Sequence, residues 1–304
     1  MPTTLLLPPA ARLSGALPEP LARRLGRADW LEPGKPGHRA QLLRQFDLLP
    51  RGWPVAALTR ELDAGDAAGA TWLRADPACV RADLTAVRQM ACGSLGLDGD
   101  EADALLKPLK LLFGDAGFPI SRTAPERWYL MLPPQSRLPA FVDPEEVLGD
   151  EIHDHLPDGP EGRRWRQLLS EAQVLLHNHP VNAGRLERGL PPVNSLWFWG
   201  GGTLPDHVRS SAAGVFTREV TLGALAARAG LEPGPVPAAP GPLPEASVLD
   251  LRALGDGVAL SAWVEALAAT KGGLALDFQD GRRAMLLPGQ RWRFWRRAWS
   301  APRA

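Results

Sequence analysis

The sequence has few cysteines, no excess of either charge and no long apolar run, and each absence excludes a class of protein. Its 304 residues include two cysteines, Cys79 and Cys92, which are too few for a disulfide framework and lack the Cys-x-x-Cys spacing of a zinc or redox site. Basic and acidic residues each number 34, so no overall field attracts nucleic acid or an anionic membrane. We therefore expect no nucleic-acid partner, and the low cysteine content is typical of a reducing cytoplasm.

The amino-terminal stretch MPTTLLLPPAARLSG lacks the features of a targeting segment. No basic residue precedes its three leucines, and the apolar run is too short for a signal sequence or a transmembrane helix. With 45% hydrophobic residues, the chain can bury a substantial core. The sequence thus predicts a globular, cytoplasmic protein without a transmembrane segment.

Helical and strand-like patterns alternate along the chain. TTLLLP predicts a short buried strand, and residues 161–178 predict a helix. TWLRADPACVRAD contains strand-like segments that Pro77 interrupts or bulges. VNSLWFW is apolar enough for a strand that is buried on both faces, as in a parallel sheet. The alternation predicts an α/β fold.

Two segments near the carboxyl end have unusual compositions. Residues 231–246 hold six prolines, which exclude regular helix and central strand and predict a spacer. Residues 290–304 contain RWRFWRRAW, in which helical spacing places Trp292, Trp295 and Trp299 on one face. Such a face can dock to an acidic protein partner, a membrane surface or a nucleotide base. We favour the alternative in which all three tryptophans pack on the domain.

Four of the six histidines form two clusters, His153 with His155 and His177 with His179. Neutral imidazole is the commonest metal ligand, so the clusters are compatible with a divalent metal such as manganese or zinc. Neither cluster has a recognised ligand spacing, and histidines at a helix end also bind carbonyl groups. We favour structural roles for all four.

A glycine triplet, Gly200–Gly202, follows the predicted strand VNSLWFW. Glycines at the end of a strand suit an anion that meets exposed backbone N–H groups. The triplet lacks the spacing of a P-loop or a dinucleotide fingerprint, so the alternative is a tight turn that lets Trp197 and Trp199 pack in the core. The serines lie in no nucleophile-elbow motif, and we find no acyl-transfer triad.

Four stretches carry a family resemblance: WLRADPACVRAD, RWYLML, HNHPVNAGR and PPVNSLWFWGGGTLP. Together with the opening of the chain, they resemble the RpfE-type regulatory proteins of proteobacteria over most of the sequence. More distantly, residues 72–230 are similar to archaeal-type cofactor-independent phosphoglycerate mutases, which have a comparable order of motifs. The last of these motifs is Asn-x-x-Trp-x-x-Gly-x-Gly, represented here by Asn194, Trp197, Gly200 and Gly202.

The resemblance implies a fold like that of the phosphoglycerate mutases and alkaline phosphatases, with one degenerate unit over residues 1–304. Its sheet would carry helices on both faces and a smaller inserted α+β subdomain at 72–150. The ligand contacts carried over from such relatives are Arg74, Asn182, Arg185 and Asn194, with the backbone amides of Gly200, Gly201 and Gly202. If this stretch keeps an anion pocket, we expect Asn194 and the Gly200–Gly202 amides to lie near Arg185 or Arg74. They would form a basic recess at the end of a central strand, with Arg185 lining its surface.

The catalytic part of the resemblance is incomplete. The mutases belong to the alkaline phosphatase superfamily, which holds two metals with an amino-terminal Asp, a Ser or Thr nucleophile, and Asp and His residues near the carboxyl end. This chain has no aspartate before Asp29 and no histidine after His207, and Thr3 or Thr4 matches the nucleophile by position only. A two-metal site requires a dense set of ligands, so we expect the active site to be lost.

The sequence thus predicts a regulatory or ligand-binding protein, a pseudoenzyme without a cofactor. Its expected partner is a small phosphorylated or carboxylate ligand, or a protein bound through Trp292, Trp295 and Trp299. The alternative is a phosphomutase or phosphohydrolase that acts on a small phosphorylated acid through a metal held by His153, His155, His177 and His179. The enzyme requires metal and turnover, whereas the binding protein requires only its partner.

Overall fold

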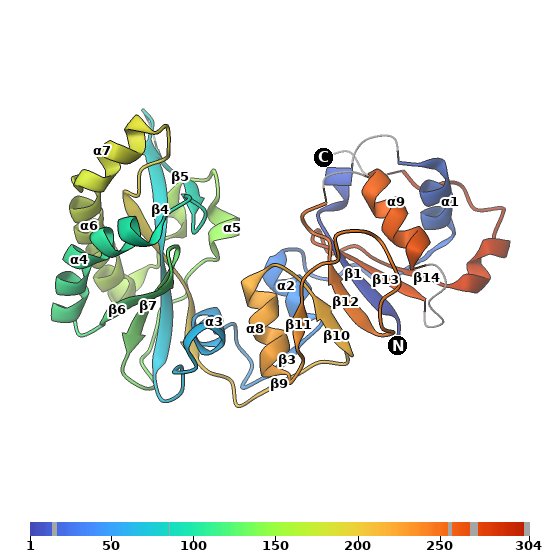
Figure 1. Ribbon diagram of the computed structural model, residues 1–304, viewed down its shortest axis with the longest axis horizontal. Helices are drawn as coiled ribbons and strands as arrows, with labels where there is room; N and C mark the ends of the chain where they lie inside the picture. Colours follow the sequence, from blue (N-terminus) through green and yellow to red (C-terminus); the bar gives the residue numbers. More distant parts are fainter. Residues whose placement is uncertain (14–16, 85, 255–256, 268–272, 301–304) are drawn as a thin grey trace. The chain divides into compact units, whose positions relative to one another are not determined.

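The computed structural model describes residues 1–13, 17–84, 86–254, 257–267 and 273–300, and it divides the chain into two compact units. The split unit consists of Met1–Arg51 and Asp206–Ala304, and the inserted unit is Gly52–Pro205 (Figure 1). The inserted unit is wider than the subdomain expected at 72–150. It is wider because a strand and two helices that follow residue 150 join the same sheet and core.

The split unit is built on a seven-stranded sheet with the order β11-β10-β12-β1-β13-β14-β2. The first five strands of this order are parallel, and the last two pairings, of β13 with β14 and of β14 with β2, are antiparallel. The strands are β1 (Thr3–Leu7), β2 (Asp29–Trp30), β10 (Gly214–Phe216), β11 (Pro233–Gly234), β12 (Ser247–Asp250), β13 (Leu274–Phe278) and β14 (Arg283–Leu286). A separate antiparallel pair joins β3 (Asp47–Leu49) to β9 (His207–Arg209). Apart from β11, residues 231–246 form neither helix nor strand, as their prolines predict.

The core of the split unit surrounds β1, the central strand. Leu5 and Leu7 pack with Leu21 and Leu260 on one face of the sheet, and Leu6 is also fully buried. Successive side chains of a strand point to opposite faces, so Leu6 lies on the other face. Burial of both faces is typical of parallel sheets and confirms the expected α/β fold. The helices are α1 (Glu19–Arg27), α2 (His38–Leu43), α8 (Val220–Arg228) and α9 (Gly257–Ala266), with 3-10 turns η1 (Ala10–Leu13) and η3 (Pro288–Trp292).

The inserted unit contains a five-stranded sheet in which all the named pairings are antiparallel. Its strands are β4 (Thr71–Ala82), β5 (Val87–Cys92), β6 (Ile120–Ala124), β7 (Arg127–Leu132) and β8 (Ser195–Thr203). The expectation of a parallel strand at VNSLWFW is therefore wrong, because β8 runs antiparallel to β4. Pro77 lies inside β4, opposite Leu196, so the two expected strand segments form one strand.

Helices cover the sheet of the inserted unit (Figure 1), and separate buried clusters that contain Leu73 and Trp72, neighbours on β4, make its burial two-sided. Phe113 and Trp165, from two different helices, pack against Phe198 of β8 in the main core cluster. The helices are α3 (Val55–Ala64), α4 (Gly99–Asp115), α5 (Pro144–Val147), α6 (Gly159–His177) and α7 (Pro180–Glu187), with the 3-10 turn η2 (Ile152–His155). Within the described ranges of both units, no helix is long and apolar enough to cross a bilayer.

Candidate functional site

Polar side chains gather at the carboxyl ends of the parallel strands in the split unit. Asp250 ends β12, Asp277 lies near the end of β13, and Thr217 follows β10. Carboxyl ends of parallel strands share one edge of a sheet, and open α/β sheets bind their ligands outside that edge. We call this group the carboxyl-edge cluster: His38, Arg44, Thr217, Glu219, Asp250, Arg252 and Asp277.

Asp250 is held by Arg252 through two hydrogen bonds. Nε of Arg252 donates to one carboxylate oxygen at 2.8 Å, and Nη2 donates to the other at 2.7 Å. The hydroxyl of Thr217 adds a third bond of 2.7 Å. Burial acts to raise the pKa of Asp250, but the hydrogen bonds and charge of Arg252 outweigh it and lower that pKa below its ordinary value. The carboxylate is therefore stabilised in its ionised form.

Arg252 also connects His38 and Glu219 to the cluster. Nη1 of Arg252 lies 2.7 Å from Nδ1 of His38, and Nε2 of His38 lies 4.0 Å from the Glu219 carboxylate. A guanidinium can only donate, so Nδ1 accepts and the proton of a neutral His38 is on Nε2, facing Glu219. Glu219 also accepts hydrogen bonds from the N–H groups of Thr221 and Leu222, each at 2.7 Å, and so caps α8.

Asp277 has its own arginine. Arg44 donates to the two carboxylate oxygens of Asp277 at 2.8 and 2.6 Å, and the Gln45 amide adds a longer bond of 3.3 Å. The Gln41 amide donates to the carbonyls of Leu7 and Asp277, which ties β1 to β13 at this edge. Both aspartates of the cluster are thus neutralised by bidentate arginine pairs.

This donor set does not fit a divalent metal. The two aspartates give all four of their oxygens to guanidinium N–H groups, so neither presents a free edge to a cation. In the part of the chain that the structure describes, no three His, Cys, Asp or Glu side chains are grouped closely enough to hold a metal ion. Thr3 and Thr4 begin β1, so they lie at the opposite edge of the sheet, and Thr3 is fully buried.

The residues expected to bind a ligand lie in the inserted unit, where protein groups surround them. Arg74, on β4, is 6% exposed and pairs with Asp76 at 2.9 and 2.8 Å. Its guanidinium lies over the rings of Tyr129 and Trp199, each at 5.2 Å. The Trp199 indole N–H in turn donates to Asp76 at 2.7 Å. Arg74 is therefore the centre of a buried polar network.

Arg185, on α7, is fully buried, and the expectation that it lines a surface recess is wrong. Its guanidinium donates to the Glu101 carboxylate at 2.6 Å, to the Leu95 carbonyl at 2.5 Å and to the Pro191 carbonyl at 2.9 Å. These acceptors use most of the donors of the side chain. Arg185 thus connects α4, α7 and two loops.

The two asparagines complete backbone hydrogen bonding. Asn182 donates to the carbonyls of Leu176 and Val193 at 2.8 and 2.9 Å and accepts from the Val193 N–H at 2.8 Å. Asn194 accepts from the N–H of Val80 and donates to its carbonyl, both at 2.8 Å, so its amide replaces one strand residue beside β4. Roles for Arg74, Asn182, Arg185 and Asn194 in ligand binding stay predictions.

Gly200–Gly202 lie inside β8 instead of forming a turn after it. A Cβ atom on Gly200 would come within 2.9 Å of the Val55 Cβ, and one on Gly202 within 2.8 Å of the Pro54 Cβ. The glycines thus let the start of α3 approach the strand closely. Asn194 pairs near Val80 and Gly202 pairs with Trp72, at opposite ends of β4, so the structure does not bring them into one recess.

Among the four clustered histidines, the side chains of His153, His155 and His179 have partners nearby in the sequence. His153 lies 3.0 Å from Glu151, and His155 lies 3.0 Å from Asp150. His177 ends α6, and His179 caps α7 by accepting from the Val181 N–H at 3.3 Å.

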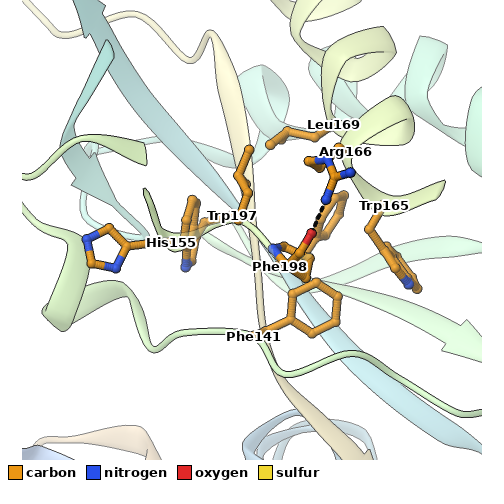
Figure 2. Close-up of a pocket in the computed structure, with 9 residues that line it drawn as sticks. Phe141, His155, Trp165, Arg166, Leu169, Trp197 and Phe198 are labelled. Carbon is orange, nitrogen blue, oxygen red and sulfur yellow. Dashed lines mark hydrogen bonds between the residues drawn. The ribbon is translucent and has the colours of Figure 1, made fainter. Parts of the chain in front are cut away.

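His155 borders a small cavity of the inserted unit, which aromatic side chains also line (Figure 2). Trp165, Trp197 and Phe198 contribute rings, and Arg166 donates to the Pro157 carbonyl at its rim. The cavity holds about 10 Å³, roughly the space of one water molecule, and so is too small for a phosphosugar acid. Trp197 is buried here and donates its indole N–H to the Val142 carbonyl at 2.9 Å, which confirms its expected core role.

The carboxyl-terminal segment departs from the expected single helical face. The 3-10 turn η3 ends at Trp292, and no helix follows among the described residues up to 300; residues 301–304 lie outside the described part. Trp299 stacks on Trp30 at 5.4 Å, but Trp292 and Trp295 are 67% and 69% exposed. The expectation that all three tryptophans pack on the domain is therefore wrong for two of them. Without helical periodicity, spacing does not place them on one face.

Part of the chain is distantly homologous to the cofactor-independent phosphoglycerate mutases. A 2,3-bisphosphoglycerate-independent phosphoglycerate mutase of Methanosarcina barkeri is 40% identical over 62 residues, which make up 20% of this chain and 16% of that protein. A probable mutase of the same kind from Geobacter sulfurreducens is 42% identical over 64 residues, 21% of this chain and 16% of its own length. The mutase of Methanosarcina acetivorans is 31% identical over 103 residues, 32% of this chain and 26% of its own length. The matches thus span only about a sixth to a quarter of these relatives.

Solved structures show a weaker likeness. A cofactor-independent phosphoglycerate mutase from Thermoplasma acidophilum aligns with 95% of this chain and 90% of its own, at 17% identity and a TM-score of 0.38. No family model matches the chain. The resemblance to RpfE-type proteins stays a prediction.

Proposed function

We propose that the chain is a regulatory or ligand-binding protein on a phosphoglycerate-mutase-like scaffold and that it does not turn over phosphoryl groups. The observation that carries the proposal is the pairing of Asp250 with Arg252 and of Asp277 with Arg44. Metal-assisted phosphoryl transfer requires carboxylates whose oxygens face cations. Here two guanidinium groups occupy those oxygens and supply the compensating charge.

The ligand class that we propose is a small acid with a phosphate or carboxylate group. The related proteins are phosphoglycerate mutases by name, and a phosphoglycerate carries both groups. Arg44, Arg252 and His38 bring guanidinium and imidazole groups to the carboxyl edge of the split unit, where such sheets bind ligands. Their side chains keep 16%, 10% and 16% of their surface exposed, so the edge is not sealed.

Two measurements on the 304-residue chain test the proposal. With added manganese, it should not interconvert 3-phosphoglycerate and 2-phosphoglycerate under conditions in which the Methanosarcina barkeri relative is active. 3-Phosphoglycerate should nevertheless raise its melting temperature, because a ligand that binds the folded state stabilises it. Arg252→Lys should reduce that rise, since lysine cannot make the bidentate contacts. Arg163→Lys, at an exposed position of the inserted unit, is the matched control.

If the chain is instead an enzyme, the assay with manganese should show turnover. Manganese-dependent turnover that disappears in Asp250→Asn, or in His153→Ala with His155→Ala, would overturn the claim of lost catalysis. If neither 3-phosphoglycerate nor a simple dicarboxylate such as malonate shifts the melting temperature, the ligand class is wrong.

A further inference from the structure

A second surface feature lies at the outer strands of the split unit. β14 starts with Arg283, and β2 ends with Trp30, so these residues meet where the two strands pair. The cavity there measures about 400 Å³, within the size range of small-molecule sites. Trp30, Leu31, Pro33, Arg282, Arg283, Trp299 and Ser300 line it, and we call it the Trp–Arg pocket. It shares no residue with the carboxyl-edge cluster.

The pocket contains two guanidinium groups without carboxylate partners among the described residues. Arg283 donates from Nη2 to the Glu32 backbone carbonyl at 2.8 Å, and its buried Nε has no acceptor. The Arg282 side chain forms no ion pair in the described part of the chain, and Asp280 instead accepts from the Arg282 backbone N–H at 3.1 Å. Other arginines of the same unit, such as Arg252, are neutralised by aspartates. The pocket is therefore locally positive in a chain without net charge.

The lining also contains two aromatic rings, those of Trp30 and Trp299. Trp30 and Trp299 stack with ring centroids 5.4 Å apart and an interplanar angle of 23°. Phe278, which is fully buried, stacks on Trp30 at 6.3 Å and holds it in place. The Trp30 indole N–H already donates to the Leu25 carbonyl, so its ring offers an apolar surface. A planar ligand group can extend such a stack.

We propose that the Trp–Arg pocket binds a free mononucleotide. The phosphate would pair with Arg282 and Arg283, since guanidinium groups match phosphate oxygens in a bidentate way. The planar base would lie against Trp30 and Trp299. The absence of a net positive charge argues for a free nucleotide over a nucleic-acid strand, which would meet a long charged surface.

Calorimetric titration of the 304-residue chain with AMP, adenosine and inorganic phosphate tests this assignment. AMP should bind more tightly than either fragment, because each fragment engages only one side of the pocket. Arg282→Met should weaken AMP binding about tenfold, the scale of one charge-assisted hydrogen bond. Trp299→Leu should weaken AMP and adenosine but leave phosphate unaffected. Arg291→Met is the matched control, because Arg291 is exposed and its guanidinium lies over Trp292, outside the pocket.

Three outcomes would overturn the proposal. Equal affinity for AMP and adenosine would exclude phosphate recognition, and equal affinity for AMP and phosphate would exclude base stacking. AMP binding that survives Arg282→Met and Arg283→Met would place the nucleotide elsewhere. Failure here leaves the proposed phosphoglycerate site untouched, since Arg252→Lys tests that site separately.

Discussion

At the scale of single residues, the arginines that resemble ligand contacts mainly bind other parts of the chain. Arg185 and Arg188 share the Glu101 carboxylate, but Arg185 is fully buried and the Arg188 side chain is 53% exposed. Removing one partner of a buried ion pair leaves an uncompensated charge out of water, whereas an exposed pair contributes little. The two arginines thus allow a comparison on one acceptor.

We predict that Arg185→Met lowers the free energy of unfolding by roughly 3–5 kcal/mol, because Glu101 and two backbone carbonyls lose their donors. Arg188→Met should cost under about 1 kcal/mol. Urea denaturation of both variants provides the measurement. Equal losses of unfolding free energy in the two variants would show that the burial of Arg185 does not strengthen its contribution to stability.

The lowered pKa of Asp250 predicts that the stability of the protein depends on pH. Its pKa is lowered in the folded state, so its contribution to stability is present above its unfolded pKa of about 3.9 and is lost as the pH falls through the folded pKa. The Asp250→Asn variant should therefore be less stable than the parent protein at neutral pH. The difference between their free energies of unfolding should narrow below about pH 4. Urea denaturation across this range measures the difference. Asp154→Asn, at an exposed carboxylate, is the matched control variant.

At the scale of elements, the close contact between α3 and β8 explains why β8 carries glycine at Gly200 and Gly202. Gly200 has a φ of 64° and Val55 lies beside it. Gly200→Val should lower stability by about 2–4 kcal/mol, through the left-handed backbone and the clash with Val55. Gly114→Ala in α4, where nothing lies within 4 Å, should be neutral or slightly stabilising. Thermal unfolding of the two variants distinguishes this packing role from an open anion turn, which would tolerate a side chain.

Substitutions of the three carboxyl-terminal tryptophans should have unequal effects on stability. Trp299→Ala should cost about 1–3 kcal/mol, because it removes a ring that stacks on Trp30. Trp292→Ser and Trp295→Ser should leave the melting temperature nearly unchanged, since both rings are mostly in water. Differential scanning calorimetry measures all three. A large loss in either serine variant would mean that these rings pack after all.

Local pattern in the sequence predicted several elements well. The expected helix at 161–178 is α6, and TTLLLP contains β1. The direction of β8 was missed, because burial on both faces does not distinguish a parallel from an antiparallel partner. That choice depends on β4, more than 100 residues earlier in the chain.

The carboxyl-edge cluster was also missed, because its members are far apart in the sequence. Arg44 and Asp277 come together only when β1 pairs with β13 and α2 packs beside them. One signal was available, since Asp250 directly follows SVL and Arg252 comes two residues later, where a parallel strand would end. Arg185 was misplaced for the opposite reason: its partner Glu101 is not visible from local spacing.

At the scale of the whole molecule, the inserted unit has a core of its own. The main cluster runs from Leu73 to Phe198, within Gly52–Pro205. We predict that a fragment of residues 52–205 folds alone and unfolds cooperatively, because its sheet and covering helices are continuous in sequence. Near-ultraviolet circular dichroism during urea titration measures this. A fragment without a cooperative transition would show that the core needs the rest of the chain.

The split unit is instead built from two separate stretches of the chain, and this affects how it folds during synthesis. β1 lies between β12 and β13, which begin at Ser247 and Leu274. On the ribosome, residues 8–246 are therefore synthesised after β1 and before the first of its two neighbours. During that interval Leu5, Leu6 and Leu7 have no sheet to enter, and an unpaired apolar strand is a template for association with other chains. We expect the nascent protein to depend on chaperones until β12 and β13 emerge, and messages truncated before these two strands to yield aggregates.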